Sequence, residues 1–148
     1  MIVYPDTSFI LSLWHAGDVN YPAATQLFSK LSGETWLWCD LHQLEVPIAA
    51  QLATHRATDA LQEHIARTIV FRAERAVTRG GFLKRQLPAE SVGFALQLAN
   101  ANGWTKRHTT LDLWHIGAAW ELGASYFATF DERQAEVAKT LRFDTNVL

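Results

Sequence analysis

Short apolar runs alternate along the chain with longer segments in which apolar residues recur at helical spacing. The runs lie at positions 2–4, 35–39 and 126–130, and less regular extended pieces lie at 82–87 and 143–147. The helical segments lie at about 8–16, 20–33, 58–79, 88–103 and 110–122, and two more begin at 40 and 131. Strands separated by helices predict a three-layer α/β/α domain, with helices on both faces of a largely parallel sheet of four or five strands.

Two prolines fall inside this pattern. Pro5 follows the first apolar run, and because proline has no N–H to donate, we expect the strand to end before it. Pro47 lies well inside the helix that begins at Asp40, so we expect this helix to bend or to start later.

Four acidic residues are predicted to meet at one edge of the sheet. Asp6 directly follows the first strand and Asp131 directly follows the strand at 126–130, so both lie at the carboxyl edge. Glu45 lies in the early turns of the helix after the second strand, and Asp112 opens the helix that leads into the strand at 126–130. In open α/β sheets, ligand sites lie outside this edge.

Clustered carboxylates need a cation. Two carboxylates about 5 Å apart repel by roughly 3 kcal/mol at an effective dielectric constant near 20. A divalent ion removes this repulsion, and all-oxygen ligands favour Mg²⁺ or Mn²⁺ over zinc. A carboxylate-bound Mg²⁺ is well suited to hydrolysing a phosphodiester bond.

Each acid also has a local, structural interpretation. Asp6 could cap the first helix, and Asp112 could be favoured by the dipole of its helix. Asp131 and Gln134 have the spacing of a capping box, and Glu45 could be a solvated helix residue. Capping is compatible with metal binding, so the convergence of all four at one edge favours a metal site.

Two histidines lie one helical turn from these acids. His115 follows Asp112 by three residues, and His42 precedes Glu45 by three. Each could donate a hydrogen bond to a site carboxylate, but the apolar neighbours at helical spacing favour buried core histidines.

Basic residues are concentrated in two places, although the net charge of −2 gives no general sign of nucleic-acid binding. Arg72, Arg75 and Arg79 share one helix face, and Lys106 with Arg107 precede the acidic edge. Either group could be a solvated surface or could contact RNA phosphates or a partner protein. The second group lies nearer the acids and is the better candidate for phosphate contact.

The composition is that of one globular domain. The chain has 148 residues, of which 49% are hydrophobic and 19% charged, and we expect a single domain over residues 1–148. Cys39 is the single cysteine, which excludes an internal disulfide and a cysteine-rich zinc site. No apolar run approaches the roughly 18 residues of a membrane span, and Asp6 interrupts a signal-peptide pattern. We therefore expect a cytoplasmic protein with no membrane contact.

Three stretches resemble the signature regions of the PIN-domain family, and of its VapC-type toxin ribonucleases in particular. They are VYPDTSFILSL, LHQLEVPIA and TTLDLWHIGAAWELGASYFATFDERQAEVA, and they follow the family's order along the whole chain. Two positions depart from the family: Pro5 replaces an aliphatic residue before the first acid, and Pro47 interrupts the helix that carries Glu45.

The resemblance implies a PIN-like fold and a set of site residues. Asp6, Glu45, Asp112 and Asp131 would form the catalytic site and bind Mg²⁺ or Mn²⁺. Thr7, Ser8 and Thr129 would support the carboxylates. The family further implies an RNA substrate, a small antitoxin that inserts a segment into the acidic groove, and a homodimer.

The sequence thus predicts a metal-dependent endoribonuclease, the toxin of a type II toxin–antitoxin pair. One alternative is a catalytically inactive binding module with the same fold. Another is an aspartyl-phosphate-type phosphatase with Asp6 as the nucleophile. That class requires a second acid two residues later, where this chain has Ser8.

Overall fold

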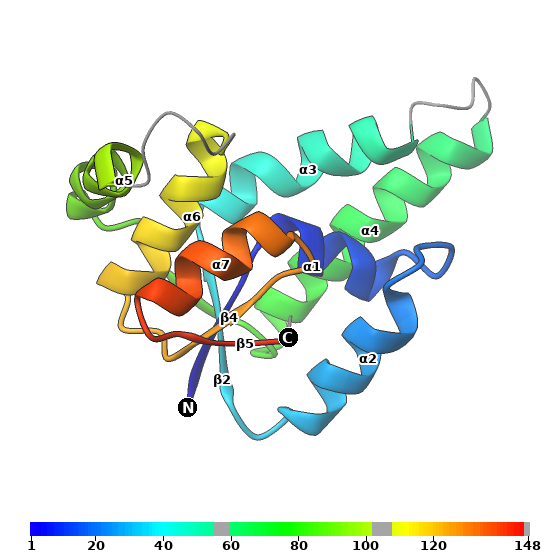
Figure 1. Ribbon diagram of the computed structural model, residues 1–148. Helices are drawn as coiled ribbons and strands as arrows, with labels where there is room; N and C mark the ends of the chain where they lie inside the picture. The colour runs from blue at the N-terminus through cyan, green and yellow to red at the C-terminus, as the bar shows by residue number, and fades with distance from the viewer. Residues whose placement is uncertain (55–59, 102–107, 147–148) are drawn as a thin grey trace.

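The chain folds into five strands and seven helices in the residues that the computed structural model describes, which are 1–54, 60–101 and 108–146 (Figure 1). In chain order the elements are β1 (Ile2–Pro5), α1 (Thr7–Trp14), α2 (Tyr21–Lys30), β2 (Thr35–Cys39), α3 (Asp40–Thr54), α4 (Ala60–Thr78), β3 (Leu83–Arg85), α5 (Glu90–Ala101), α6 (Thr110–Glu121), β4 (Tyr126–Ala128), α7 (Glu132–Thr140) and β5 (Asp144–Thr145).

All five strands run parallel in one sheet of order β3-β2-β1-β4-β5. The predicted parallel α/β sheet is therefore confirmed. Strand β1 lies at the centre, with Val3 opposite Trp36 of β2 on one side and opposite Tyr126 of β4 on the other. The residue that follows β1, Asp6, is consequently placed at the middle of the carboxyl edge.

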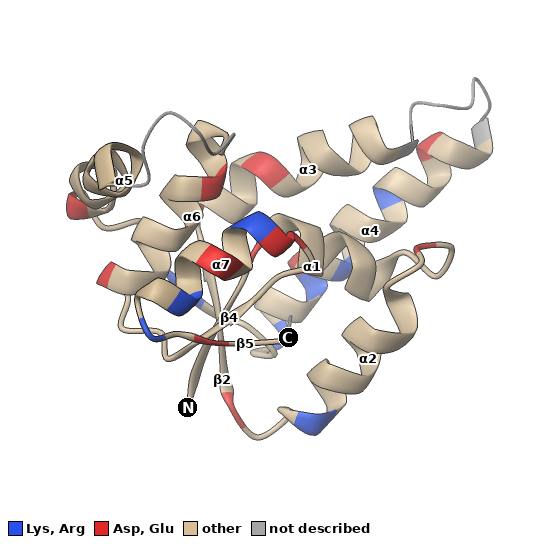
Figure 2. Cartoon of the chain, in the orientation of Figure 1, with Lys and Arg blue, Asp and Glu red and all other residues tan. Residues whose placement is uncertain are grey.

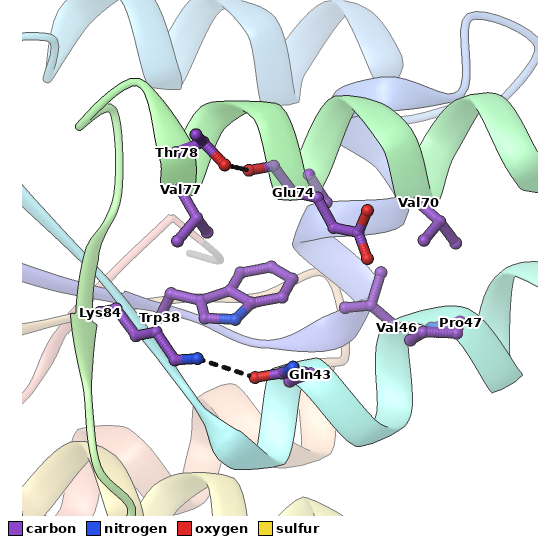
Figure 3. Close-up of a pocket in the computed structure, with 10 residues that line it drawn as sticks. Trp38, Gln43, Val46, Pro47, Val70, Glu74, Val77, Thr78 and Lys84 are labelled. Carbon is purple, nitrogen blue, oxygen red and sulfur yellow. Dashed lines mark hydrogen bonds between the residues drawn. The ribbon is translucent and has the colours of Figure 1, made fainter.

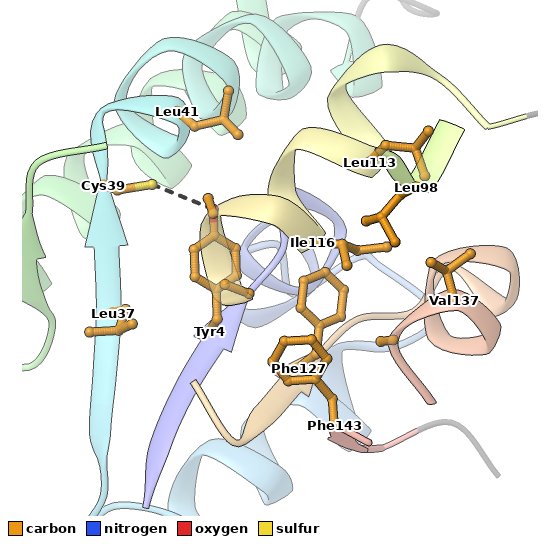
Figure 4. Close-up of a cluster of buried hydrophobic side chains, with 13 residues drawn as sticks. Tyr4, Leu37, Cys39, Leu41, Leu98, Leu113, Ile116, Phe127, Val137 and Phe143 are labelled. Carbon is orange, nitrogen blue, oxygen red and sulfur yellow. Dashed lines mark hydrogen bonds between the residues drawn. The ribbon is translucent and has the colours of Figure 1, made fainter. Parts of the chain in front are cut away.

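Alternate residues of the central strands enter two separate apolar layers. Tyr4, Leu37 and Phe127 pack with α5, α6 and α7 on one face, as Figure 4 shows. Val3 and Trp36 point the other way and pack with α1, α2 and α4. This alternation produces the predicted three-layer arrangement, because each helix layer covers one face of the sheet.

Helices α3 and α4 pair with each other and extend beyond the sheet (Figure 1). Their distal contact is made by the buried residues Ala50, Ala66 and Ile69. Helix α3 runs from Asp40 with Pro47 inside it, so of the two expected effects the later start is wrong, and the bend stays a prediction. Burial of residues on both sides of the proline, including Val46 and Ala50, holds the helix together despite the missing N–H. Within the described residues, every helix is too short or too polar to span a membrane.

Strand β1 includes Pro5, contrary to the expectation that it ends before the proline. The ladder with β4 continues past Pro5, since the Asp6 N–H donates to the Ala128 carbonyl at 2.9 Å. On the β2 side, His42 Nε2 contacts the Pro5 carbonyl at 2.6 Å, and His42 Nδ1 accepts from the Cys39 N–H at 2.9 Å. His42 thus joins the two strand ends as a buried core histidine.

Strand β4 is shorter than the predicted segment 126–130, because the chain leaves the sheet after Ala128. The Thr129 N–H donates to Asn146 Oδ1 at 2.9 Å, and the Phe130 N–H donates to Ser8 Oγ at 3.1 Å. These bonds turn the chain toward Asp6.

Candidate active site

Asp6 lies at the centre of the carboxyl edge and is almost completely buried, with 1% of its surface exposed. It caps α1 by accepting from the Phe9 N–H at 2.8 Å. It also accepts from Ser8 Oγ at 2.8 and 2.9 Å and from Thr129 Oγ1 at 2.7 Å. Burial raises the pKa of Asp6, while the bonds from Phe9, Thr129 and Ser8 act in the opposite direction. Ser8 and Thr129, two of the residues that the resemblance implies as supports of the site, therefore both contact this acid.

Asp112 is fixed at the start of α6 by a reciprocal capping box. Its Oδ2 accepts from the Thr109 N–H at 2.7 Å, and its own N–H donates to Thr109 Oγ1 at 3.2 Å. Its other oxygen, Oδ1, accepts from Gln134 Nε2 at 3.3 Å. The same Nε2 donates to Asp6 Oδ2 at 3.1 Å. One amide nitrogen therefore joins two carboxylates that come from different elements.

From the sequence, Gln134 was assigned to a capping box, and its side-chain contact with the two carboxylates was not predicted. Asp131 does cap α7, accepting from the Arg133 and Gln134 N–H groups at 2.8 and 3.2 Å. The reciprocal half is absent, because the Asp131 N–H donates to Thr129 Oγ1 at 2.9 Å instead. One signal in the sequence could have revealed the side-chain contact of Gln134. Gln134 lies three and four residues before the buried Val137 and Ala138, so the three side chains share one face of the helix.

Asp131 is held at the same edge and paired with a cation of its own helix. Arg133 Nη2 donates to Asp131 Oδ2 at 2.9 Å. Burial raises the pKa of Asp131, but the hydrogen bonds and charge of Arg133 outweigh it and leave the pKa below its ordinary value. The Thr129 hydroxyl donates to Asp6 and accepts from the Asp131 N–H, so it connects the two acids.

Glu45 reaches the edge from α3 and is held by two partners. Its Oε2 accepts from Thr7 Oγ1 at 2.5 Å and lies 2.5 Å from His115 Nε2. His115 is itself buried, and its Nδ1 lies 2.8 Å from the Tyr4 hydroxyl. Burial raises the pKa of Glu45, but His115 and Thr7 outweigh it and hold the pKa below its ordinary value. His115 is therefore both a buried core residue and a contact of Glu45, one of the predicted site acids.

The donor set at this edge fits a hard divalent cation. Among the described residues, no group of three Asp, Glu, His or Cys side chains is gathered as a ready-made metal cluster. Asp6 and Asp112 are nevertheless brought to one amide, and Gln134 Oε1 is buried without a hydrogen-bond partner in the described part of the chain. Mg²⁺ is commonly held by only one or two carboxylates, with water and substrate oxygens completing its shell. The Asp6–Asp112 pair satisfies that requirement.

The basic residues stand apart from this geometry. Arg72 and Arg75 are exposed on α4, and Arg79 is exposed directly after it. Arg75 lies over the ring of Phe71, with its guanidinium carbon 5.9 Å from the ring centre. Helix α4 packs on α3 and α1. Figure 2 shows acidic positions on α3, α6 and α7, and α4 itself carries Glu63 and Glu74. Lys106 and Arg107 lie outside the described residues, so contact of either group with RNA stays a prediction.

A separate hollow lies between α3, α4 and β3 (Figure 3). Its walls include Trp38, Val46 and Val77, with Glu74 and Lys84 at its polar side. Lys84 Nζ donates to Gln43 Oε1 at 3.0 Å across its rim. None of the four predicted site acids lines this hollow, so it is distinct from the acidic edge.

The fold and site together define an α/β domain with an acidic centre at the carboxyl edge of a parallel sheet. The PIN domain family model matches residues 3–140, and the chain therefore belongs to the PIN domain family. This confirms the family predicted from the three signature stretches. No curated protein sequence matches this chain significantly.

Solved structures share this fold at low sequence identity. VapC20 of Mycobacterium tuberculosis, described as a sarcin-ricin loop cleaving toxin, aligns with a TM-score of 0.67 and 16% identity over 90% of this chain and 93% of its own. VapBC2 of Rickettsia felis, bound to a DNA fragment from its promoter, aligns with a TM-score of 0.62 and 12% identity over 99% of this chain and 98% of its own. The fold of this chain is accordingly that of VapC proteins.

Proposed function

We propose that this protein is a metal-dependent endoribonuclease that hydrolyses RNA phosphodiester bonds, and that it is the toxin of a type II toxin–antitoxin pair. The observation that carries the proposal is the convergence of Asp6 and Asp112 on one buried amide at the carboxyl edge of the sheet. Membership of the PIN domain family and the likeness to a toxin that cleaves the sarcin-ricin loop support it.

In this proposal Asp6 and Asp112 hold a Mg²⁺ or Mn²⁺ ion, and Asp131 and Glu45 complete its surroundings or orient the attacking water. When bound, the ion supplies charge neutralisation on the phosphoryl oxygens and lowers the pKa of a water molecule. The remaining side chains act on the acids. Thr129 and Ser8 fix the orientation of the Asp6 carboxylate through their hydroxyls.

Glu45 has the properties of a group that accepts a hydrogen bond from the attacking water. Its lowered pKa keeps it ionised near neutral pH, so it is an acceptor. Thr7 and His115 both contact Oε2. They hold the carboxylate in one orientation, and Oε1 is the oxygen we assign to the water.

Two kinds of macromolecular partner follow from this function. Lys106, Arg107 and the exposed face of Arg72, Arg75 and Arg79 are proposed to contact RNA phosphates or a partner protein. A small antitoxin is proposed as the protein partner, which the likeness to VapBC2 supports, and we propose that it covers the acidic edge. An antitoxin arginine would bind these acids through the kind of pair that Arg133 forms with Asp131. A homodimer is proposed from the family.

The test is cleavage of a mixed set of structured RNAs with Mn²⁺ or Mg²⁺ by the purified protein free of any partner. Parallel samples contain EDTA, the Asp6→Asn variant and, as a matched control, Asp144→Asn at an exposed position of β5. Cleavage that is retained in Asp144→Asn and lost in EDTA and in Asp6→Asn supports the proposal. Equal cleavage by Asp6→Asn contradicts it, because the activity then comes from elsewhere.

A catalytically inactive binding module is the second candidate. The observation that favours it is the absence of a three-acid metal cluster among the described residues. In that case a folded protein shows no cleavage, and its thermal stability is unchanged by Mg²⁺ or Mn²⁺. An aspartyl-phosphate phosphatase is less well supported, since Ser8 Oγ donates to both oxygens of Asp6, the proposed nucleophile.

A further inference from the structure

We propose that Gln134 is a positioning residue that holds Asp6 and Asp112 together while no ion is bound and releases both carboxylates when the ion binds. The inference rests on the proposed function, because it concerns the same metal site. The side chain of Gln134 would then compete with the metal ion for the carboxylates of Asp6 and Asp112.

The geometry of the Gln134 amide is that of a substitute for a cation. Its Nε2 lies 3.1 Å from Asp6 Oδ2 and 3.3 Å from Asp112 Oδ1, so one NH₂ group contacts a carboxylate of each residue. Gln134 is 5% exposed and Asp6 is 1% exposed, so water screens this contact weakly. Without the amide, the buried carboxylate of Asp6 would face that of the half-buried Asp112 with no donor between them.

The oxygen of the Gln134 amide provides a second observation. Gln134 Oε1 is buried and finds no hydrogen-bond donor among the described residues. A buried carbonyl without a donor is unfavourable, so this orientation is not one that satisfies the amide itself. It is the orientation that satisfies the two carboxylates.

Asp6 Oδ1 and Asp112 Oδ2 accept the backbone N–H groups of Phe9 and Thr109, so the oxygens without a helix-cap contact are Asp6 Oδ2 and Asp112 Oδ1. An ion between these two oxygens would take the place of Nε2, and in this proposal its binding displaces both hydrogen bonds from Gln134. An interaction that exists only in the ion-free protein stabilises that state alone, and by linkage it weakens metal binding by the same factor. Removing the amide should consequently lower the stability of the ion-free protein and tighten metal binding.

The experiment compares Gln134→Met with the wild-type protein. Methionine has similar length and no donor. Gln43→Met is the matched control, because Gln43 lies on α3 at an exposed position and its side chain contacts Lys84. Mn²⁺ binding is followed by the electron paramagnetic resonance signal of the free ion, and thermal unfolding is measured in EDTA and in saturating Mn²⁺. Asp6→Asn shows which binding belongs to this site.

We expect Gln134→Met to unfold at a lower temperature than wild type in EDTA and to bind Mn²⁺ about tenfold more tightly, with Gln43→Met unchanged in both. Weaker Mn²⁺ binding by Gln134→Met would overturn the inference, because the residue would then be a ligand. Unchanged affinity with a lower unfolding temperature would also overturn it, leaving a purely structural role. If Gln134→Met does not fold, Gln134→Ala is measured with the same criteria.

Failure of this inference is distinguishable from failure of the proposed function. If wild type binds Mn²⁺ and Asp6→Asn does not, the metal site stands, and equal affinities of wild type and Gln134→Met reject the role of Gln134 alone. If wild type binds no Mn²⁺, the metal-dependent function fails and the inference fails with it.

Discussion

His115 and Glu45, which lie 70 positions apart in the sequence, are in direct contact through Nε2 and Oε2. The contact joins α3 to α6, and the Tyr4 hydroxyl fixes the other ring nitrogen from the central strand. The orientation of Glu45 therefore depends on a residue in the apolar core, and core packing is coupled to the acidic edge.

Replacing His115 tests this dependence. In His115→Phe, Glu45 loses one of its two partners and the Tyr4 hydroxyl loses its ring nitrogen. We expect a loss of about 1–3 kcal/mol in the free energy of unfolding, measured by urea denaturation, and a fall in the cleavage rate. His115→Gln keeps a polar group near Glu45 and should retain more of both. Wild-type stability and cleavage in His115→Phe, with losses in His115→Gln, would show that only ring volume matters.

Thr129 is expected to contribute to both stability and catalysis through one hydroxyl. Its Oγ1 donates to Asp6 and accepts from the Asp131 N–H, and the side chain is fully buried. Thr129→Val keeps the shape and removes both bonds, so we expect about 1–3 kcal/mol lower stability and reduced cleavage. Thr129→Ser, which keeps the hydroxyl, is the control. Wild-type cleavage by Thr129→Val would contradict a role in orienting Asp6.

Replacement by alanine should change the free energy of unfolding in opposite directions at two glycines. A Cβ at Gly117 of α6 would lie 2.6 Å from the Ser91 carbonyl oxygen, so the two helices would have to separate. We expect Gly117→Ala to lower the free energy of unfolding by about 1–3 kcal/mol. A Cβ at Gly93 of α5 would lie in open space. Gly93→Ala should therefore raise the free energy of unfolding by about 0.5–1 kcal/mol. Chemical denaturation of both variants gives the signs.

His42 should make the protein less stable in mild acid. Burial, with the charge of His115, lowers its pKa from 6.5 to about 3, while the Pro5 carbonyl and Glu45 act in the opposite direction. The unfolded chain therefore takes up a proton near pH 6.5 that the folded chain refuses until about pH 3. Stability is complete above pH 6.5 and is lost as the pH falls, by about 2 kcal/mol between pH 7 and pH 5.

The measurement for His42 is urea denaturation of wild type and His42→Gln at pH 7 and pH 5. The variant should be less stable at pH 7, because it cannot join the Cys39 N–H and the Pro5 carbonyl as the ring does. Its additional loss at pH 5 should be smaller than that of wild type. Identical losses would show that another group causes the acid sensitivity.

The layers of the fold could be predicted because they depend on local pattern. The alternation of apolar residues around Val3 and Tyr4 gives a strand buried on both faces, and helices between strands give parallel order. The position of Asp6 followed from the same rule. Strand β4 ends earlier than predicted because the side chains of Ser8 and Asn146 accept the N–H groups of the next two residues. No local pattern in the sequence indicates these two contacts.

The four predicted site acids could be assigned to the carboxyl edge from the sequence, but their hydrogen-bond partners could not. Gln134 is three residues after Asp131, so local spacing assigned it to a cap, whereas its side chain meets Asp6 across the sheet edge. Pro47 was expected to disturb the helix that carries Glu45, yet buried neighbours on both sides keep that helix whole. In each case a long-range contact outweighs the local preference.

Among the described residues, the two outer strands of the sheet are short, with three residues in β3 and two in β5. Lys84 and Arg85 lie on one and Asp144 on the other, and all three are exposed. Short, charged edges offer too few free backbone groups for a foreign strand to add to the sheet. A protein that inhibits or assembles with this domain must consequently recognise side chains on its helices and loops, and the folded chain is protected against edge-to-edge polymerisation.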